Sequence, residues 1–399
     1  MRSSLRQKLL SRDSLFCGFF AALCVALCFV NLNRFEETKI QDGLQHARAR
    51  VLSVDNSTVR QNLMLRSGAQ RLEVELLSGP DKGKQLTADN ILTGQLALDE
   101  YFQPGDDLLL QYSSSPQGKP IAGVARGHYR VQGEVLMCVL FVVLLLLVAG
   151  STGAKALLSF AFSALLIWKI MIPLFLDGKN PIMIGMGVVL LLTACICFLV
   201  GGLTRRGLAS FLGSVLGLAV TCVLALVFTD AFRINGAVRP FSETLLYSGF
   251  FELKLTPIFI AAVVIGCSGA MMDLSMDIAS AMHEIKEKSP GIGRWEHIRS
   301  GLSVGRAVTG TMTTTLLLAY SSSYITMLML FTSQGMPLAR IANINYVAAE
   351  FLNIMVGSFG LVTVAPFTAL VSGFIWHYRM PATQPQAKPV AQASEAQTV

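Results

Sequence analysis

Charged residues are scarce in this 399-residue chain: Asp, Glu, Lys and Arg make up 14% of it, against 53% hydrophobic residues and a mean hydropathy of +0.56. Soluble globular chains carry about a quarter charged residues, so this composition argues against a cytosolic enzyme. The scarcity is regional. Residues 33–130 hold 24 charged side chains, whereas the much longer stretch 134–376 holds 25. The sequence therefore divides into a polar domain of ordinary composition and a large apolar body.

Motifs for catalysis or cofactor binding are also missing. The chain has no Gly-rich phosphate-binding loop, no HExxH and no GxSxG. It has five His, and none forms a metal-spaced pair within an apolar segment. We therefore expect no enzyme activity, no metal site and no cofactor. The net charge of +7 predicts no nucleic-acid binding, because residues 33–130 balance 12 basic against 12 acidic side chains.

The polar domain contains no cysteine. All eight cysteines fall in the long apolar runs: Cys17, Cys24, Cys28, Cys138, Cys195, Cys197, Cys222 and Cys267. A small domain without cysteines has no disulfide framework. We therefore expect a hydrophobic core to hold the polar domain together.

Apolar runs are abundant. A helix needs about 20 mostly apolar residues to cross about 30 Å of hydrocarbon. Eight segments have that length, at about 14–32, 133–150, 155–176, 181–200, 208–229, 256–280, 305–331 and 346–376. The last is long for one crossing, and Gly360 and Pro366 are residues that can bend or break it.

The placement of Lys and Arg predicts the orientation, because basic residues near a span are retained in the cytoplasm. Four basic residues precede the first segment, and alternation puts the basic loop between the sixth and seventh segments on the same side. Five basic residues then fall in short outer loops: Lys179, Arg233, Arg239, Lys254 and Arg340. Both termini are predicted to be cytoplasmic. The first segment lacks a small-x-small cleavage site, which favours an uncleaved anchor over a signal peptide.

Residues 46–131 show strand patterns. At 71–76 (Arg-Leu-Glu-Val-Glu-Leu) apolar residues alternate strictly, as in a strand with one buried face. Further candidate strands lie at 47–54, 108–112 and 121–131. Candidate turns lie at 79–83 and 104–106. This spacing predicts a small barrel or sandwich of about five strands, of the OB-like kind. Such a domain can bind a ligand, but the lack of catalytic side chains favours a structural or partner-docking cap.

Ionisable residues inside the apolar segments are the candidate functional residues, because each is costly in hydrocarbon. Asp273 and Asp277 project from one face of the sixth segment. Gly266 and Ala270 continue that stripe at a spacing that lets another helix approach closely. Two carboxylates four residues apart predict uptake of a proton or neutralisation by a cation. For Asp277, close to the membrane surface, simple solvation is the favoured interpretation.

Arg306 begins the seventh segment at a depth similar to that of Asp273. It shares a helix face with Gly310, Thr313 and Thr314. These residues predict a polar path, with Gly310 as a point of close helix approach. An Asp273–Arg306 ion pair that only clamps two helices together explains the same residues without transport, so both interpretations stay open.

The eighth segment carries a stripe of Glu350, Asn353, Gly357 and Gly360. Glu350 lies near the outer end, so we expect no contact with Arg306. An outer and an inner carboxylate on different helices are the layout of a proton or cation relay, although one buried Glu is common in helical bundles. Gly357 is a further candidate for close helix approach.

Several separated blocks resemble the YibE/F-like family of multi-spanning bacterial membrane proteins. They are 265–273 (Ile-Gly-Cys-Ser-Gly-Ala-Met-Met-Asp), 278–281, Gly305-Arg306, 310–312, 316–320, Glu350 with 357–360, and 366–369. The resemblance covers about 130–376, and the polar domain more loosely. It implies an integral protein of the bacterial cytoplasmic membrane and no particular function. The chain departs from the family pattern at Ala307, Thr314 and Asn353, where relatives commonly have Asp, Asn and Arg.

The predicted fold is mainly α: a bundle of about eight transmembrane helices, with a small β-rich extracytoplasmic domain between the first two. The expected parts are an N-terminal anchor at 1–32, the β-rich domain at 33–132, a seven-span membrane domain at 133–376 and a disordered cytoplasmic tail at 377–399. We expect a permease or channel-like transporter of a small solute or ion that uses polar residues of the sixth to eighth helices. The alternative is a non-transporting membrane scaffold or assembly factor whose outer domain binds a protein partner. The lipid bilayer is a partner in both.

Overall fold

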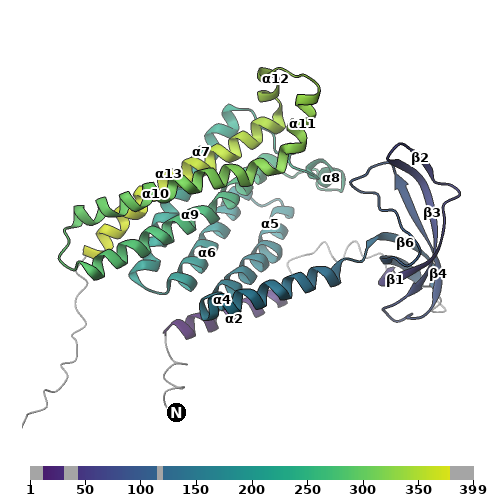
Figure 1. The fold of residues 1–399 in the computed structure, drawn as a ribbon, viewed down its shortest axis with the longest axis horizontal. Helices are drawn as coiled ribbons and strands as arrows, with labels where there is room; N and C mark the ends of the chain where they lie inside the picture. The colour runs from purple at the N-terminus through teal and green to yellow at the C-terminus, as the bar shows by residue number, and fades with distance from the viewer. Residues whose placement is uncertain (1–11, 31–43, 115–119, 378–399) are drawn as a thin grey trace, which may run out of the picture. The chain divides into compact units, whose positions relative to one another are not determined.

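The computed structural model describes residues 12–30, 44–114 and 120–377 (Figure 1). They form two compact units. One contains the strands and the first part of helix α4, up to residue 154, and the other contains the remaining helices. The predicted basic N-terminus before residue 12 and the predicted tail after residue 377 lie outside the described residues.

Six strands form the described part of the β-rich unit. They are β1 (Leu44–Asp55), β2 (Arg60–Asn62), β3 (Leu65–Leu76), β4 (Gln85–Thr93), β5 (Asp107–Ser114) and β6 (Pro120–His128). Each predicted strand lies in one of them, except that the last ends at His128 and helix α4 begins at Val131. The sequence patterns do not predict β2 or β4.

The strands close into a barrel. Their order is β1-β5-β6-β4-β3, and the pairing of β3 with β1 closes the barrel. Strand β2 pairs with the first residues of β3. All pairings are antiparallel except β4 with β6. This order is that of an OB-like barrel. The prediction of a small β-barrel is therefore confirmed.

Alternate side chains fill the barrel. Its core consists of Ala47, Ala49, Val51, Leu72, Val74, Leu76, Leu86, Ala88, Phe102, Leu108, Leu110 and Tyr112. Gln70, fully buried, adds a polar link: its side chain accepts a hydrogen bond from the Phe102 N–H (3.0 Å) and donates to the Phe102 carbonyl (3.1 Å). Asn90 donates to the same Gln70 amide at 2.9 Å. Because each of these buried polar groups has a partner, the link does not weaken the core.

The predicted turns are present, and glycine makes them possible. Gly79 and Gly83 have φ of 87° and 83°, and Gly105 has φ of 96°, values that L side chains rarely adopt. The Gly105 N–H donates to the Val51 carbonyl at 2.8 Å. This bond fixes the second turn against β1.

Helix α4 (Val131–Leu166) leads from the barrel into the helical unit. Gly150 has φ 54° and ψ −127°, so this stretch consists of two helices that meet at a kink. The break predicted between residues 150 and 155 lies here. The boundary between the two compact units also falls here, after residue 154.

The remaining elements form the helical unit. They are α2 (Arg12–Phe29), η1 (Ile167–Met171), α5 (Ile172–Leu176), α6 (Pro181–Gly201), α7 (Arg205–Ala231), η2 (Gly236–Val238), α8 (Ser242–Tyr247), α9 (Leu255–Lys288), α10 (Arg294–Ser321), η3 (Ser322–Tyr324), α11 (Ile325–Ser333), α12 (Leu338–Ala342) and α13 (Asn345–His377). Helix α13 continues through Gly360 and Pro366 without a break. In Figure 1 the long helices α7, α9, α10 and α13 lie side by side.

Helices α7, α9 and α13 form the centre of this unit. A Cβ at Gly213 of α7 would collide with Thr368 of α13, so these two helices need a glycine to approach this closely. Ser275 of α9 donates to the Ser210 carbonyl of α7 (2.8 Å) and lies 2.9 Å from Thr368 Oγ1. These contacts join the three helices. A second cluster joins α2 to the end of α4, where the Phe20 and Phe162 rings meet edge-on at 5.1 Å.

Within the described residues, five helical stretches are long and apolar enough to cross a membrane: residues 131–176, α6, α7, α9 and α13. Helices α10 and α11, which are bent by 65°, form a sixth if they are one span. Two differences separate this count from the predicted eight. The described part of the first segment is a shorter apolar helix (Leu15–Phe29), and the second and third segments are continuous in 131–176.

Candidate functional site

An ion pair between Arg239 and Glu350 joins two distant parts of the helical unit. Glu350 lies on the second turn of α13, and Arg239 lies in the segment between α7 and α9, 111 residues earlier. The distance from Arg239 Nη1 to Glu350 Oε1 is 2.8 Å. The two side chains are 34% and 25% exposed, so each remains accessible to a solute.

Close packing at Gly236 fixes the segment that carries Arg239. A Cβ at Gly236 would collide with the Leu255 carbonyl at the start of α9. The Gly236 N–H donates to Thr256 Oγ1 at 3.3 Å. Arg239 follows in an extended conformation, and its carbonyl accepts a hydrogen bond from Ser242 Oγ (2.7 Å) at the start of α8. The segment is thereby attached on both sides of Arg239.

Two neighbours complete the surroundings of the pair. The Arg239 guanidinium lies over the Phe259 ring of α9, 5.2 Å from its centroid, where a cation is attracted by the ring face. Asn353, one turn after Glu350, donates to Glu350 Oε2 at 3.4 Å. Both carboxylate oxygens therefore have a donor. The pair therefore links three elements: the segment that follows η2, helix α9 and helix α13.

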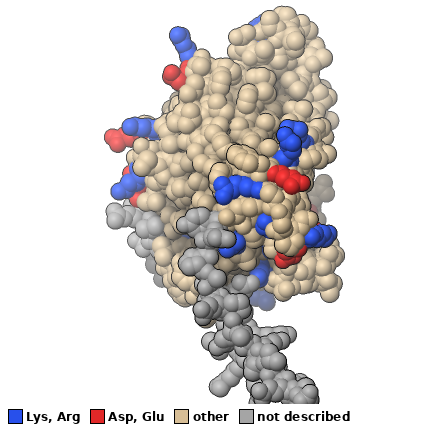
Figure 2. All heavy atoms as spheres, turned by 90° about the vertical axis from the view of Figure 1, so that its left-hand side faces the viewer, with Lys and Arg blue, Asp and Glu red and all other residues tan. Residues whose placement is uncertain are grey.

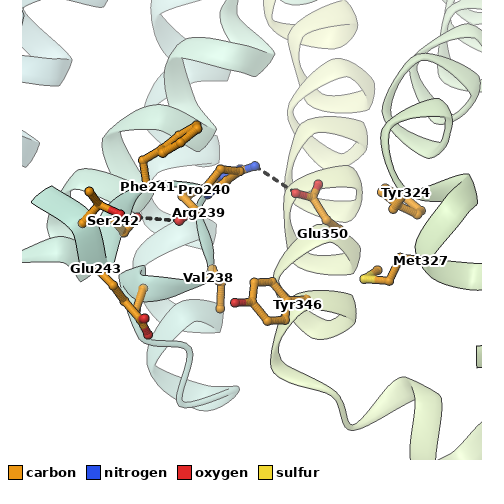
Figure 3. Close-up of a pocket in the computed structure, with 12 residues that line it drawn as sticks. Val238, Arg239, Pro240, Phe241, Ser242, Glu243, Tyr324, Met327, Tyr346 and Glu350 are labelled. Carbon is orange, nitrogen blue, oxygen red and sulfur yellow. Dashed lines mark hydrogen bonds and ion pairs between the residues drawn. The ribbon is translucent and has the colours of Figure 1, made fainter. Parts of the chain in front are cut away.

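A cavity of about 570 Å³ adjoins the ion pair (Figure 3). One wall is the segment 237–244, and the other carries Glu350 and Tyr346 of α13. Tyr324, the last residue of η3, and Met327, in the first turn of α11, lie beside Glu350 in Figure 3. The lining offers charges of both signs and several hydroxyl groups. Ligand pockets typically measure about 300–1,000 Å³, so this cavity has room for a small solute.

Asp273 and Arg306 do not form an ion pair within the part of the chain that the structure describes. Arg306 lines a groove together with Leu370 of α13, and no α9 residue lines that groove. Asp273 and Asp277 are both exposed on α9, and neither side chain has a hydrogen bond or ion pair with another described residue. The predicted clamp between the sixth and seventh segments is therefore not seen, because Arg306 lies against α13 instead.

The two threonines predicted to line a path lie away from the cavity. Thr313 is half-buried and donates to the Thr309 carbonyl of its own helix at 2.8 Å, as Ser and Thr commonly do in apolar helices. Thr314 is exposed. Neither lines the cavity beside Glu350.

The three glycines predicted at helix contacts differ in their surroundings. A Cβ at Gly357 would lie 2.7 Å from Cys267 Sγ of α9, which is too close, so α13 and α9 need a glycine there. A Cβ at Gly266 would meet Tyr320 Oη at 3.6 Å, an ordinary contact. Gly310 is exposed, and a Cβ there would meet nothing within 4 Å.

Family models match both units of the structure. Residues 137–378 match the model described as YibE/F-like protein, and residues 44–124 match the model of the YibE/F family N-terminal domain. The chain belongs to the YibE/F-like family. It has no significant match among curated proteins or among solved structures. Among residues 12–30, 44–114 and 120–377 of this YibE/F-like chain, no group of three or more His, Cys, Asp or Glu is placed to hold a metal ion.

Arg239 is the half of the ion pair in this YibE/F-like site that the sequence patterns do not single out. They place it among five basic residues in the predicted outer loops. The rule that basic residues are retained inside makes an outer arginine unusual. A carboxylate near the outer end of a span, such as Glu350, is the natural partner for it. The presence of both residues was therefore the sequence feature that could have predicted the ion pair.

Proposed function

We propose that this YibE/F-like protein is a permease or channel-like transporter of a small polar solute or ion. The solute binds beside Arg239 and Glu350. The observation that carries the proposal is a partly exposed Arg–Glu pair in the wall of a 570 Å³ cavity, at one end of a bundle of apolar helices. Ionisable residues in such bundles are rare, need partners and commonly mark solute paths.

The charges of the site favour one class of solute. A solute carboxylate fits Arg239, and a solute ammonium fits Glu350 or Glu243, which also lines the cavity. A solute with a single charge leaves one half of the opened pair without a partner, and an unpaired, partly buried charge is costly. A zwitterion replaces both halves at once. Small zwitterionic solutes are therefore the first class to test.

The proposed topology has eight spans with both termini in the cytoplasm. The spans are α2, the two helices that meet at Gly150, α6, α7, α9, the bent pair α10–α11, and α13. The distribution of Lys and Arg supports this orientation. In the cytoplasmic membrane of a bacterium it puts the barrel and the Arg239 cavity on the extracytoplasmic side. The barrel then acts as a cap, or as a first contact for the solute.

A second candidate function is a membrane scaffold or assembly factor, with the barrel as the docking domain for a protein partner. The observation that favours it is the support of the ion pair by Phe259 and Asn353. Through these contacts the pair holds three elements together, as a purely structural clamp would.

Thermal unfolding of the purified full-length protein separates the two functions. Glycine, acetate and methylammonium serve as the zwitterionic, anionic and cationic probes. Under the transport proposal glycine raises the melting temperature, because it binds only the folded protein, and acetate and methylammonium raise it less. The shift is lost in Arg239→Gln. It persists in Asp277→Asn, which removes an exposed charge outside the cavity.

A different result supports the scaffold. If no probe changes the melting temperature of the parent protein, and Arg239→Gln and Glu350→Gln both lower it, the pair is structural. The transport proposal is then contradicted for this site. Uptake of labelled glycine into proteoliposomes, compared between the parent protein and Glu350→Gln, tests transport directly.

A further inference from the structure

A groove of about 900 Å³ runs along the first three turns of α10, at the opposite end of the helical unit from the Arg239 cavity. Trp295, Arg299, Leu302 and Arg306 line it from α10, and Leu370 lines it from α13. Their spacing of four, three and four residues puts the α10 residues on one face. Arg299 and Arg306 are separated by about 10 Å of helix rise.

The side chains of the two arginines of this groove have no ion pair, hydrogen bond or ring contact with any other described residue. Both are exposed. One carboxylate, that of Glu296, also lines the groove. Two guanidinium groups therefore face one carboxylate, and the groove has a net positive charge. Guanidinium groups form bidentate hydrogen bonds to phosphate.

Most of the remaining lining is apolar. The buried Ile298, together with Leu302 and Leu370, contributes to it, and Ser303 adds one hydroxyl group. No charged residue follows Arg306 in α10, which ends at Ser321. A molecule with a phosphate and a hydrocarbon chain fits this groove, because its phosphate can bind the two arginines and its chain can pack on the two leucines.

The groove also lies where a membrane surface is expected. Trp295 is 71% exposed on the first turn of α10. Trp376 lies at the same end, because its neighbour His377 contacts the Ile292 carbonyl at 3.0 Å just before α10. Trp is enriched at membrane–water interfaces. Figure 2 looks onto this end of the helical unit, where Lys and Arg side chains lie on the surface together with Asp and Glu side chains.

We infer that this groove binds the head group of an anionic phospholipid, with Arg299 and Arg306 on the phosphate. Basic pockets between membrane helices bind anionic lipids in this way. The inference does not rest on the proposed transport function, since the two sites share no residue. It holds equally for a transporter and for a scaffold.

The test compares lipids on the full-length protein in a non-ionic detergent. Phosphatidylglycerol should raise the melting temperature more than phosphatidylcholine at the same mole fraction. Native mass spectrometry should show retained phosphatidylglycerol. Both effects should fall by at least half in the double variant Arg299→Gln/Arg306→Gln. Both effects should persist in the control variant Arg340→Gln, which removes an exposed charge on α12. They should also largely persist in Arg299→Lys/Arg306→Lys. This second variant keeps both positive charges, so it distinguishes a loss of charge from a folding defect.

Three results would overturn the inference. One is an equal response to the two lipids. Another is a phosphatidylglycerol response that is unchanged in the double Gln variant. The third is a response to inorganic phosphate that the double variant loses while phosphatidylglycerol has no effect, because the occupant would then be a soluble anion.

Discussion

Arg239 Nη1 lies 2.8 Å from Glu350 Oε1 and attaches the segment before α9 to the second turn of α13. The arginine is held by Phe259 and the carboxylate by Asn353. Since both partners border a cavity and are partly exposed, either one stays in contact with the cavity when the other is removed. The pair is therefore suited both to hold the bundle together and to open for a solute.

The first prediction concerns the coupling of this pair. Arg239→Gln and Glu350→Gln should each lower the free energy of unfolding by about 1–2 kcal/mol, because a charge loses its partner. The double variant should lose less than the sum of the two, with a coupling of about 1 kcal/mol. Unfolding in detergent, followed by Trp fluorescence, measures all three values. Strict additivity would show that the two side chains do not interact.

The second prediction concerns the contact between Gly357 and Cys267. Gly357→Ala should lower the free energy of unfolding by about 1–3 kcal/mol, because the new Cβ overpacks the α9–α13 contact. Adding Cys267→Ala should restore part of the loss, since the Cys267 Cβ lies at 3.7 Å and only its Sγ is too close.

Gly310→Ala is the matched control for this contact. Gly310 is surrounded by open space, so the substitution should be neutral or stabilise α10 by up to about 1 kcal/mol through helix propensity. Equal losses at Gly310 and Gly357 would contradict the packing explanation.

The third prediction concerns pH and the barrel. Asp107 accepts hydrogen bonds from Arg50 (3.0 Å) and Arg48 (2.6 Å). The bond from Arg50 lowers the pKa of the Asp107 carboxyl, and Arg48 adds to the effect against some desolvation. A lowered pKa in the folded state means that this carboxylate stabilises the barrel fully above its ordinary pKa of about 3.9. The contribution is lost as the pH falls through the folded-state pKa.

Asp107→Asn tests this sign. At neutral pH the variant should exchange the amides of β1 and β5 faster than the parent protein, as measured by hydrogen exchange at matched pH. The difference should shrink as the pH falls below about 4, where the parent carboxyl becomes protonated. A difference that grows towards acid would contradict the assignment.

The fourth prediction tests the eight-span topology. If the chain crosses the membrane on both sides of the Gly150 kink, Ser151→Cys should react with a membrane-impermeant maleimide only after the cells are permeabilised. Lys82→Cys, in a barrel turn, should react in intact cells. Equal labelling of the two in intact cells would exclude the proposed orientation.

The barrel could largely be predicted from sequence, because its strands alternate between apolar and polar residues and its turns contain glycine. Strand β4 was missed for a physical reason. Its inward positions include Ala88 and Asn90, and the buried amide of Asn90 is satisfied by Gln70. A strand that buries a polar residue lacks the expected alternation.

The candidate site was harder to predict. Glu350 stands out as a carboxylate in an apolar helix, but Arg239 lies in a segment without periodicity and meets Glu350 only through the packing of Gly236 on α9. One of the two interpretations of Arg306 paired it with Asp273 of α9, whereas in the structure it lines a groove with Leu370 of α13. Which neighbour a helix face meets depends on the arrangement of the whole bundle, and local spacing contains no information about it.

The β1–β3 pairing restricts how another protein could bind the barrel. An open sheet presents unpaired backbone groups along its edge, and a peptide can add to them as an extra strand. Here each of the five barrel strands has a neighbour on both sides, and within the described strands only the three-residue β2 has a single partner. Strand addition is therefore disfavoured except beside the short β4–β6 pairing, which covers two residue pairs. Elsewhere, a partner of this domain would have to recognise side chains on its outer face or in its loops.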